Sequence, residues 1–468
     1  MTVKVPLRGY ILDRAVNDQP TKRGFSIRSE SQNKTVGMVS LGCSKNQVDA
    51  ERLLGALRAA GYAVSPRAED CGVVIINTCG FIESAKQEAI DVILEFAAKK
   101  QAGEIGGLLV TGCLSERYRE EFIAQLPEVD GVLGIGKNAE VVAAVEAVLA
   151  GKQYFAFGDK ENLPLEGARL AVGGAHSVYL KVAEGCDNRC SYCAIPDIRG
   201  RFRSRTMESI LAEAKELIKA GAVELNLVAQ DTTRYGEDIY GELALPTLLE
   251  KLCEIEDLRW VRLLYCYPQR VTDRLLDVIR AQEKVVKYMD LPVQHASGKV
   301  LEEMNRRGDA NSLKGLVERI REKVPGVTVR TTLITGFPGE SEADFETLCQ
   351  FVKDVRFDRL GCFAYSQEEG TPAGAREDQL DEETKRRRAE IVMELQATIA
   401  EEQAKAKIGM EIEVLCEGYD KGKTIARGQA DAPDVDGRVL LTGKEAPGRF
   451  VRVRVIGAEG YDLIAERV

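Results

Sequence analysis

Three closely spaced cysteines are the residues of this chain best suited to chemistry. Cys186, Cys190 and Cys193 follow an apolar run at CxxxCxxC spacing. Thiolates are soft ligands, so three on one short loop predict a metal site. They are one ligand short of the four that a structural zinc or a saturated 4Fe-4S cluster needs, which favours a cluster with one open iron. The alternative is a zinc site completed by a distant ligand, and the only histidines are His176 and His295.

A second set of three cysteines is spread over the first part of the chain. Cys43, Cys79 and Cys113 each follow a short apolar run, and their spacing matches that of β-α-β units. Amphipathic patterns at 48–60 and 82–99 predict the helices between them. Because the parallel strands of such units end at one edge of a sheet, the three cysteines should converge there as a second cluster site. Taken singly, each could instead be a small buried residue at a strand end.

Composition limits the class of protein. The chain has 468 residues, 44% of them hydrophobic and 29% charged, which suits about two to four domains with ordinary cores. Its net charge of -10 argues against a broad electrostatic grip on nucleic acid. The sequence contains no run of about 18 apolar residues, so no membrane span is predicted. Twelve cysteines without a secretory signal predict a cytoplasmic protein.

The two cysteine sets, in this order, resemble those of the radical S-adenosylmethionine (SAM) methylthiotransferases. The resemblance covers about residues 35–468 and is carried by the motifs at 40–46, 77–82, 183–190 and 229–233. These motifs are most similar to the branch that adds a methylthio group to the β-carbon of an aspartate in ribosomal protein S-twelve. Such enzymes insert sulfur into an unactivated C–H bond, and their cofactors carry the difficult chemistry.

The resemblance implies a set of cofactors and site residues. Cys186, Cys190 and Cys193 would hold a 4Fe-4S cluster that binds SAM. Cys43, Cys79 and Cys113 would hold another 4Fe-4S cluster that carries sulfur from a sulfide or polysulfide donor, so all six cysteines would be catalytic. Contacts with SAM are expected at Tyr192, Gln230, Ile334 and Gly336. The implied partners are the small ribosomal subunit with its protein S-twelve, and an electron donor of the flavodoxin or ferredoxin type.

The expected fold class is α/β, followed by a small β-barrel. Residues 1–35 are expected to be a disordered extension and 36–150 a parallel-sheet α/β domain with the first cluster. Residues 172–402 should form a partial (β/α)6 barrel of the radical SAM type, and 405–468 a small antiparallel barrel similar to a TRAM domain. Strands of the partial barrel are expected at 177–183, 222–229, 260–266, 286–291, 327–335 and 358–365, with the chemistry at their carboxyl ends.

Other features leave alternatives open. Residues 334–340 end a strand with glycines and resemble the adenine-side turn of the family, or they form an ordinary strand-to-helix turn. Four alternating arginines would share one face of an extended segment and hold a carboxylate, or they form a solvated basic loop: Arg199, Arg201, Arg203 and Arg205. His295 lines the mouth of the partial barrel or is structural. His176 is expected to be structural.

The charge of the last segment bears on the substrate. Residues 407–468 contain 10 Lys and Arg against 11 Asp and Glu, which is a poor footprint for RNA. Stable RNA binding is therefore not expected, and acidic positions such as Asp431, Asp434 and Asp436 would suit a basic ribosomal protein. The competing hypotheses are a transfer-RNA methylthiotransferase acting on a modified adenosine, and a non-catalytic iron–sulfur or zinc protein that binds the ribosome.

Overall fold

The computed structural model describes residues 34–68, 71–171 and 176–468. These residues form two compact units. The first contains the described residues up to 171 together with Glu184–Asp187 and Ala194–Arg201, and the second contains the rest. Residues 1–33 of the predicted extension lie outside the described residues, whereas Thr35 already begins a strand.

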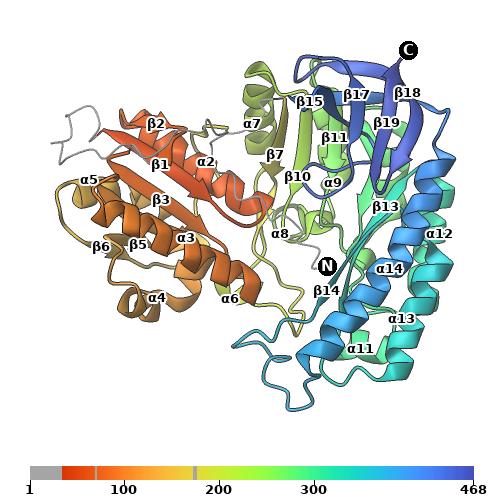
Figure 1. Ribbon diagram of the computed structural model, residues 1–468, viewed down its shortest axis with the longest axis horizontal. Helices are drawn as coiled ribbons and strands as arrows, with labels where there is room; N and C mark the ends of the chain where they lie inside the picture. The colour runs from red at the N-terminus through yellow and green to blue at the C-terminus, as the bar shows by residue number, and fades with distance from the viewer. Residues whose placement is uncertain (1–33, 69–70, 172–175) are drawn as a thin grey trace. The chain divides into compact units, whose positions relative to one another are not determined.

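The first unit is built on a six-stranded parallel sheet (Figure 1). Its strands run in the order β2-β1-β3-β4-β5-β6. The elements in chain order are β1 (Thr35–Ser40), α2 (Ser44–Ala59), β2 (Ala63–Ser65), β3 (Val73–Thr78), α3 (Glu83–Gln101), β4 (Gly107–Gly112), α4 (Cys113–Gln125), β5 (Gly131–Leu133), α5 (Val141–Leu149) and β6 (Tyr154–Ala156). The short helix α6 (Ile195–Arg199) also belongs to this unit.

Helices cover both faces of this sheet because its strands are apolar on both sides. Val73 and Ile75 of β3 pack with α2 and α5, while Val74 and Ile76 pack with α3 and α4. Such continuous apolar runs are typical of buried parallel strands. The chain reverses its direction of winding between β1 and β3, and in open α/β sheets the carboxyl ends at this reversal form the usual binding crevice.

The second unit contains another six-stranded parallel sheet, in the order β14-β13-β12-β11-β10-β7. Its strands are β7 (Ser177–Lys181), β10 (Glu224–Val228), β11 (Trp260–Leu263), β12 (Val285–Asp290), β13 (Thr328–Thr335) and β14 (Arg359–Ala364). Its main helices are α7 (Met207–Lys219), α9 (Leu245–Cys253), α10 (Asp273–Ala281), α11 (Gly298–Glu303), α12 (Ala310–Lys323), α13 (Glu342–Val355) and α14 (Glu382–Ala406). All six predicted strands of the partial barrel are present, with ends that differ by a few residues.

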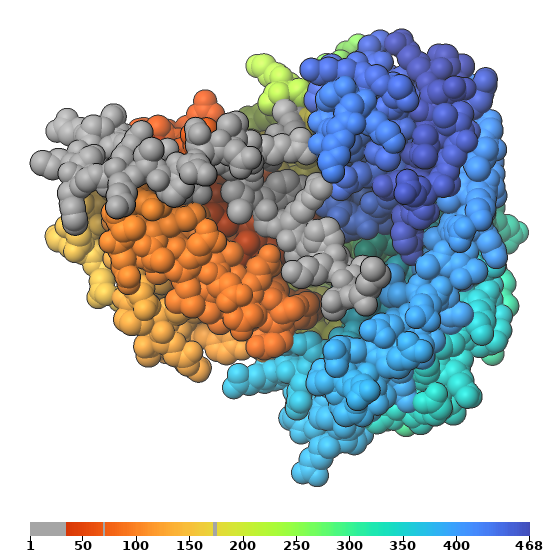
Figure 2. All heavy atoms as spheres, viewed as in Figure 1, coloured from red at the N-terminus to blue at the C-terminus, as the bar shows by residue number. Residues whose placement is uncertain are grey.

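A closed five-stranded barrel follows α14 in the same unit. Its strands are β15 (Glu411–Asp420), β16 (Lys423–Gly428), β17 (Val439–Thr442), β18 (Phe450–Glu459) and β19 (Asp462–Arg467). Figure 2 shows the barrel as a rounded lobe next to α14. The barrel was expected to be antiparallel, but β17 and β19 pair in parallel. Short β patterns at 411–415, 437–441 and 450–455 predict β15, β17 and β18, whereas no such pattern predicts β16 and β19.

Buried ion pairs join this barrel to the strands of the partial barrel. Arg427 pairs with Glu224, the first residue of β10, and the two side chains are 2% and 0% exposed. Arg359, the first residue of β14, lies 2.6 Å from Asp431. Tyr288 donates a hydrogen bond to Asp436 over 2.6 Å. The C-terminal barrel therefore closes the end of the sheet at which several strands begin, opposite the end expected to carry the chemistry.

These contacts contradict the prediction that Asp431 and Asp436 contribute to an acidic docking surface. Asp431 is 2% exposed and the side chain of Asp436 is also 2% exposed, so neither faces a partner protein. Asp434 accepts a hydrogen bond from Tyr179 over 3.0 Å. Asp431 and Asp436 pair with arginines of the neighbouring sheet, whereas Asp434 is exposed as expected.

Within residues 34–68, 71–171 and 176–468, no helix combines the length and the apolar character that crossing a membrane requires.

Candidate functional site

The first cysteine set lies at the carboxyl edge of the sheet in the first unit. Cys43 follows β1 and precedes α2, Cys79 follows β3, and Cys113 begins α4 directly after β4. The three side chains are near enough to affect one another: burial, together with the neighbouring Cys113 and Cys43, raises the pKa of Cys79 to about 12. The structure thus brings the three cysteines to the winding reversal, as the spacing predicts.

Two glycines allow the strand ends to approach this closely. Gly42 has a φ of +93°, and a Cβ atom there would lie 2.8 Å from the Cβ of Cys79. Gly112 has a φ of +103°, and its added Cβ would lie 2.4 Å from the carbonyl oxygen of Thr78. Both the backbone conformation and the space therefore require glycine.

Cys43, Cys79 and Cys113 are donors of the kind that an iron–sulfur cluster takes, since in a cluster each cysteine binds a different iron. In the described parts of the chain, no group of three or more His, Cys, Asp or Glu converges on a point where one metal ion could bind.

The CxxxCxxC loop is shared by the two units. Cys186 belongs to the first, where its N–H donates to the carbonyl of Gly200 over 3.2 Å. Cys190 and Cys193 belong to the second, and the N–H of Cys193 donates to the carbonyl of Cys190 over 3.0 Å. All three are partly buried. Ser191 fixes the loop to the end of α11, since its N–H and hydroxyl donate to the carbonyls of Met304 and Glu303 over 3.0 and 2.7 Å.

Two arginines that the sequence analysis missed contact this loop. Arg306 donates to the sulfur of Cys190 over 3.6 Å and lies over the ring of Tyr267, 4.5 Å from its centroid. Arg270 donates over 2.9 Å to the side chain of Asn188 within the loop. Arg270 also pairs with Asp231 over 2.8 Å. Both arginines are remote from the cysteines in sequence, so no local motif indicated them.

The predicted SAM contacts lie in the second unit. Tyr192 and Ile334 pack against the same apolar cluster, which includes Phe337 and Met304. Burial raises the pKa of Tyr192 well above its usual range, and Cys190 adds to this rise. Gln230 follows β10 and directly precedes Asp231, which Asn188 of the cysteine loop contacts over 2.9 Å. The structure therefore groups Tyr192 with Ile334 and places Gln230 beside a residue that contacts the loop.

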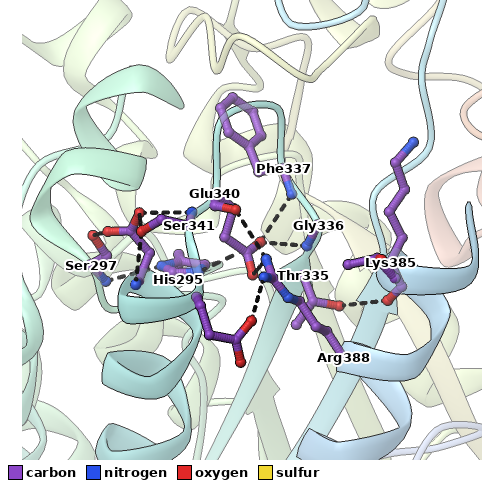
Figure 3. A network of polar contacts seen from close by, with 12 residues as sticks. His295, Ser297, Thr335, Gly336, Phe337, Glu340, Ser341, Lys385 and Arg388 are labelled. Carbon is purple, nitrogen blue, oxygen red and sulfur yellow. Dashed lines mark hydrogen bonds and ion pairs between the residues drawn. The ribbon is translucent and has the colours of Figure 1, made fainter. Parts of the chain in front are cut away.

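The turn after β13 is held by its own glutamate (Figure 3). The carboxylate of Glu340 accepts hydrogen bonds from the N–H groups of Gly336 and Phe337, the latter over 3.0 Å. Arg388 of α14 donates to the same carboxylate over 3.0 Å. A Cβ on Gly336, whose φ is +71°, would lie 2.4 Å from Lys385 of α14. Because Glu340 occupies the N–H of Gly336, this glycine has a structural role in seating the turn against α14, and its contact with SAM remains a prediction.

His295 lies beside this turn and is buried. Its Nδ1 accepts a hydrogen bond from the N–H of Ser297 over 3.0 Å, and burial lowers the pKa of the imidazole to about 4. The ring is therefore neutral near pH 7. Its Nε2 lies 3.9 Å from Glu340, which is too long for a hydrogen bond. His176 is partly buried, and its carbonyl accepts the N–H groups of Val223 and Glu224, in keeping with its expected structural role.

The four alternating arginines are divided between the two units, with Arg199 and Arg201 in the first and Arg203 and Arg205 in the second. Arg199 ends α6 and is 1% exposed within the first unit. Arg205 is 3% exposed within the second, where it pairs with Glu213 over 2.6 Å. The segment is not extended throughout, because α6 comes before the extended residues. The burial of Arg199 and Arg205 shows that the solvated-loop hypothesis is wrong for these two residues, and binding of a ligand carboxylate by the arginines stays a prediction.

Four residues in and after the cysteine loop, β11, β12 and α11 of the second unit have a left-handed backbone conformation. Arg189 in the cysteine loop, Tyr265 after β11, Gln294 after β12 and Asn305 after α11 have φ values between 50° and 73°. Such conformations are uncommon for residues other than glycine and often occur at functional sites. Asn305 donates to the carbonyl of Arg189 over 2.9 Å, so this strained backbone helps to hold the loop.

Comparison with known families divides the chain into three parts. Residues 35–134 match the Uncharacterized protein family UPF0004, residues 180–352 the Radical SAM superfamily, and residues 408–468 the TRAM domain. Among solved structures, the radical SAM methyltransferase TsrM from Kitasatospora setae has a similar fold, with a TM-score of 0.56 at 12% identity. That match covers 73% of this chain and 77% of TsrM.

Curated relatives match almost from end to end. The ribosomal protein uS12 methylthiotransferase RimO of Desulfitobacterium hafniense is 46% identical over 448 residues, which are 94% of this chain and 100% of the relative. The RimO protein of Geobacter sulfurreducens is 45% identical over 437 residues, 92% of this chain and 98% of the relative. The chain carries a radical SAM domain between its N-terminal sheet and its TRAM barrel, and it belongs to the RimO family of radical SAM methylthiotransferases.

Proposed function

We propose that this protein adds a methylthio group to the β-carbon of an aspartate in uS12, the S-twelve protein of the small ribosomal subunit. The observation that carries the proposal is the similarity over the full length of enzymes named for this activity. All three parts of the chain fall within the similarity. The sequence motifs beside Cys43, Cys79 and Cys186 support the same branch of the family.

In this proposal the two cysteine sets have separate roles. Cys186, Cys190 and Cys193 hold the 4Fe-4S cluster that binds SAM, and Cys43, Cys79 and Cys113 hold a second cluster. When bound, these cofactors supply the one-electron chemistry that opens a C–H bond and the sulfur to be delivered. A sulfide or polysulfide source and a flavodoxin- or ferredoxin-type electron donor complete the reaction.

The side chains around the second set then position the reacting groups. Arg306 donates a hydrogen bond to the sulfur of Cys190 over 3.6 Å and so helps to orient this ligand. Tyr192 and Ile334 pack against one apolar cluster, which would exclude water from SAM when it is bound there. Ser191 fixes the loop to α11 through two hydrogen bonds, so that the ligands are held before the cofactor binds.

We place the reaction in the cytoplasm. All twelve cysteines lie within the described residues and none of them forms a disulfide. Free thiols in this number suit a reducing compartment.

The proposal is tested with anaerobically reconstituted protein. Replacing Cys186, Cys190 and Cys193 with alanine should remove about half of the iron and abolish SAM cleavage, because only one site loses its ligands. Replacing Cys43, Cys79 and Cys113 should also remove about half of the iron, yet leave reductive SAM cleavage and yield no methylthiolated product. Full product formation by the second variant would overturn the role of its cluster.

A matched control and a choice of substrates complete the test. The control variant replaces Cys253, Cys349 and Cys362, which are also partly buried but belong to neither set, and it should keep both its iron and its activity. Isolated uS12, the small subunit and transfer RNA are offered to each protein and analysed by mass spectrometry. Modification of transfer RNA alone would refute the proposed substrate and favour the transfer-RNA hypothesis.

A further inference from the structure

One buried arginine is directed at the first cysteine set. Arg199 is the last residue of α6 and is 1% exposed. Its Nε and Nη2 donate to the sulfur of Cys113 over 3.3 and 3.1 Å. In sequence it follows the CxxxCxxC motif, but it packs in the first unit with Cys113. The guanidinium thus uses two of its five N–H groups on a single sulfur atom.

The other contacts of Arg199 hold it in that orientation. Nη1 pairs with Asp49 of α2 over 2.5 Å and with Glu184 over 3.3 Å. Nη2 also donates to the side chain of Asn46 over 3.0 Å. Asp49 and Glu184 are 3% and 0% exposed, so they keep the arginine charged within the protein. Three side chains from two segments therefore fix the fork of the guanidinium against Cys113.

This geometry suits a sulfur that carries negative charge. The sulfur of a neutral thiol is a weak hydrogen-bond acceptor, and an arginine that served only as a counterion would direct its N–H groups to carboxylates. Charge-assisted hydrogen bonds are about twice as strong as neutral ones, so a thiolate bound to iron would make full use of both donors. The contacts with Asp49 and Glu184 alone do not account for the two N–H groups of Arg199 that are directed at Cys113.

We propose that Arg199 is a positioning residue for the first cluster: it orients Cys113 through two N–H···S bonds and makes the cluster easier to reduce. The inference rests on the proposed function, since it requires Cys43, Cys79 and Cys113 to hold that cluster. Hydrogen bonds to the sulfurs and nearby positive charge stabilise the reduced cluster, which carries one more electron. The segment that leaves the SAM-binding motif thereby supplies a residue that sets the properties of the other cluster.

The test isolates the first cluster in a Cys186→Ala, Cys190→Ala, Cys193→Ala background. Arg199→Gln and Arg199→Lys are added, and the anaerobically reconstituted proteins are titrated with reductant and followed by electron paramagnetic resonance. At the midpoint potential of the parent, Arg199→Gln should lower the ratio of reduced to oxidised cluster at least tenfold, which is a shift of about 59 mV for one electron. Arg199→Lys keeps the charge and should shift the ratio less.

Two further variants separate this effect from damage to the fold. Arg199→Gln with Asp49→Asn keeps the net charge of the buried group, so it guards against unfolding caused by an unpaired carboxylate. Arg169→Gln is the matched control, because Arg169 is also buried and pairs with Glu51 in the same unit, and it should leave the midpoint unchanged. Loss of iron from the folded double variant, with Arg169→Gln still loaded, would also support a positioning role.

The outcomes distinguish a failure of the proposed function from a failure of the role of Arg199 alone. A parent background that holds no cluster overturns the proposed function and the inference with it. A loaded parent whose Arg199 variants keep the same midpoint potential and the same resonance spectrum overturns the role of Arg199 alone.

Discussion

The buried contact between the C-terminal barrel and the radical SAM sheet leads to a quantitative prediction. The carboxylate of Glu224 lies between Arg427 and Arg262, whose Nε is 3.1 Å away. Both arginines are almost fully buried. Glu224→Gln therefore leaves two buried guanidinium groups without the carboxylate between them. Breaking a buried ion pair in this way costs about 3–5 kcal/mol of unfolding free energy.

A second substitution should cost less in this background than on its own. Arg427→Met removes one of the two guanidinium groups that have lost Glu224, and Arg262 keeps its 2.7 Å hydrogen bond to the carbonyl of Gln429. Arg427 also pairs with Glu417 over 2.9 Å, and Arg427→Met removes this contact in either background. We expect the loss in the double variant to be smaller than the sum of the two single losses by about 1–2 kcal/mol, since contacting residues show coupling energies of this order. Two independent losses would instead add.

The chain contains its own probe for this experiment. Trp260, the only tryptophan, packs edge-on against Phe450 of the C-terminal barrel with ring centroids 4.8 Å apart. Its fluorescence should therefore report separation of the barrel from the sheet during urea denaturation. With a slope of about 3 kcal/mol per molar urea, the expected loss in Glu224→Gln lowers the midpoint by about 1 M or more. A loss in the double variant equal to the sum of the two single losses would refute the reasoning.

Three further predictions concern other side chains. Burial by itself would raise the pKa of Glu224, but Arg427 and Arg262 hold this pKa at about 2. The stabilisation by the Glu224 carboxylate is therefore complete above about pH 4.5 and is lost as the pH falls towards 2. The urea midpoint should fall across this window more steeply in the unmodified protein than in Glu224→Gln, and equal slopes would contradict this. Arg306→Met should change the resonance spectrum of the SAM-binding cluster and slow SAM cleavage, whereas exchange of the adjacent exposed Arg307 should do neither. Glu340→Gln should speed hydrogen exchange at the N–H groups accepted by Glu340, and unchanged protection there would show that the turn is held by other contacts.

The sheets and the first cysteine set could be predicted because their determinants are local. Each strand that precedes Cys43, Cys79 or Cys113 is a run of apolar residues, and the helical patterns between them fix the parallel connection. Parallel connection then forces the cysteines to one edge. β5, β6, β16 and β19 are short or mixed in polarity, so periodicity gave little indication of them.

The partners of the buried charges could not be predicted in this way. Arg199 is 86 residues from Cys113 and 150 residues from Asp49, and no pattern within either segment indicates the pairing. The same holds for Asp431 and Arg359, which are 72 residues apart. Most charged residues are exposed, so the charges of Asp431 and Arg359 suggested a surface position. Only the packing of the C-terminal barrel on the sheet reveals that these two side chains are buried.

The central claim is that this protein methylthiolates uS12, and the most direct measurement is the mass of that protein in cells. Intact-mass and peptide analysis of uS12 from a strain lacking this protein should show complete loss of a methylthio group from one aspartate. Supplying the unaltered gene should restore it, and supplying either cysteine-to-alanine triple variant should not. If uS12 keeps its modification in the deleted strain while a methylthiolated adenosine disappears from transfer RNA, the account is contradicted.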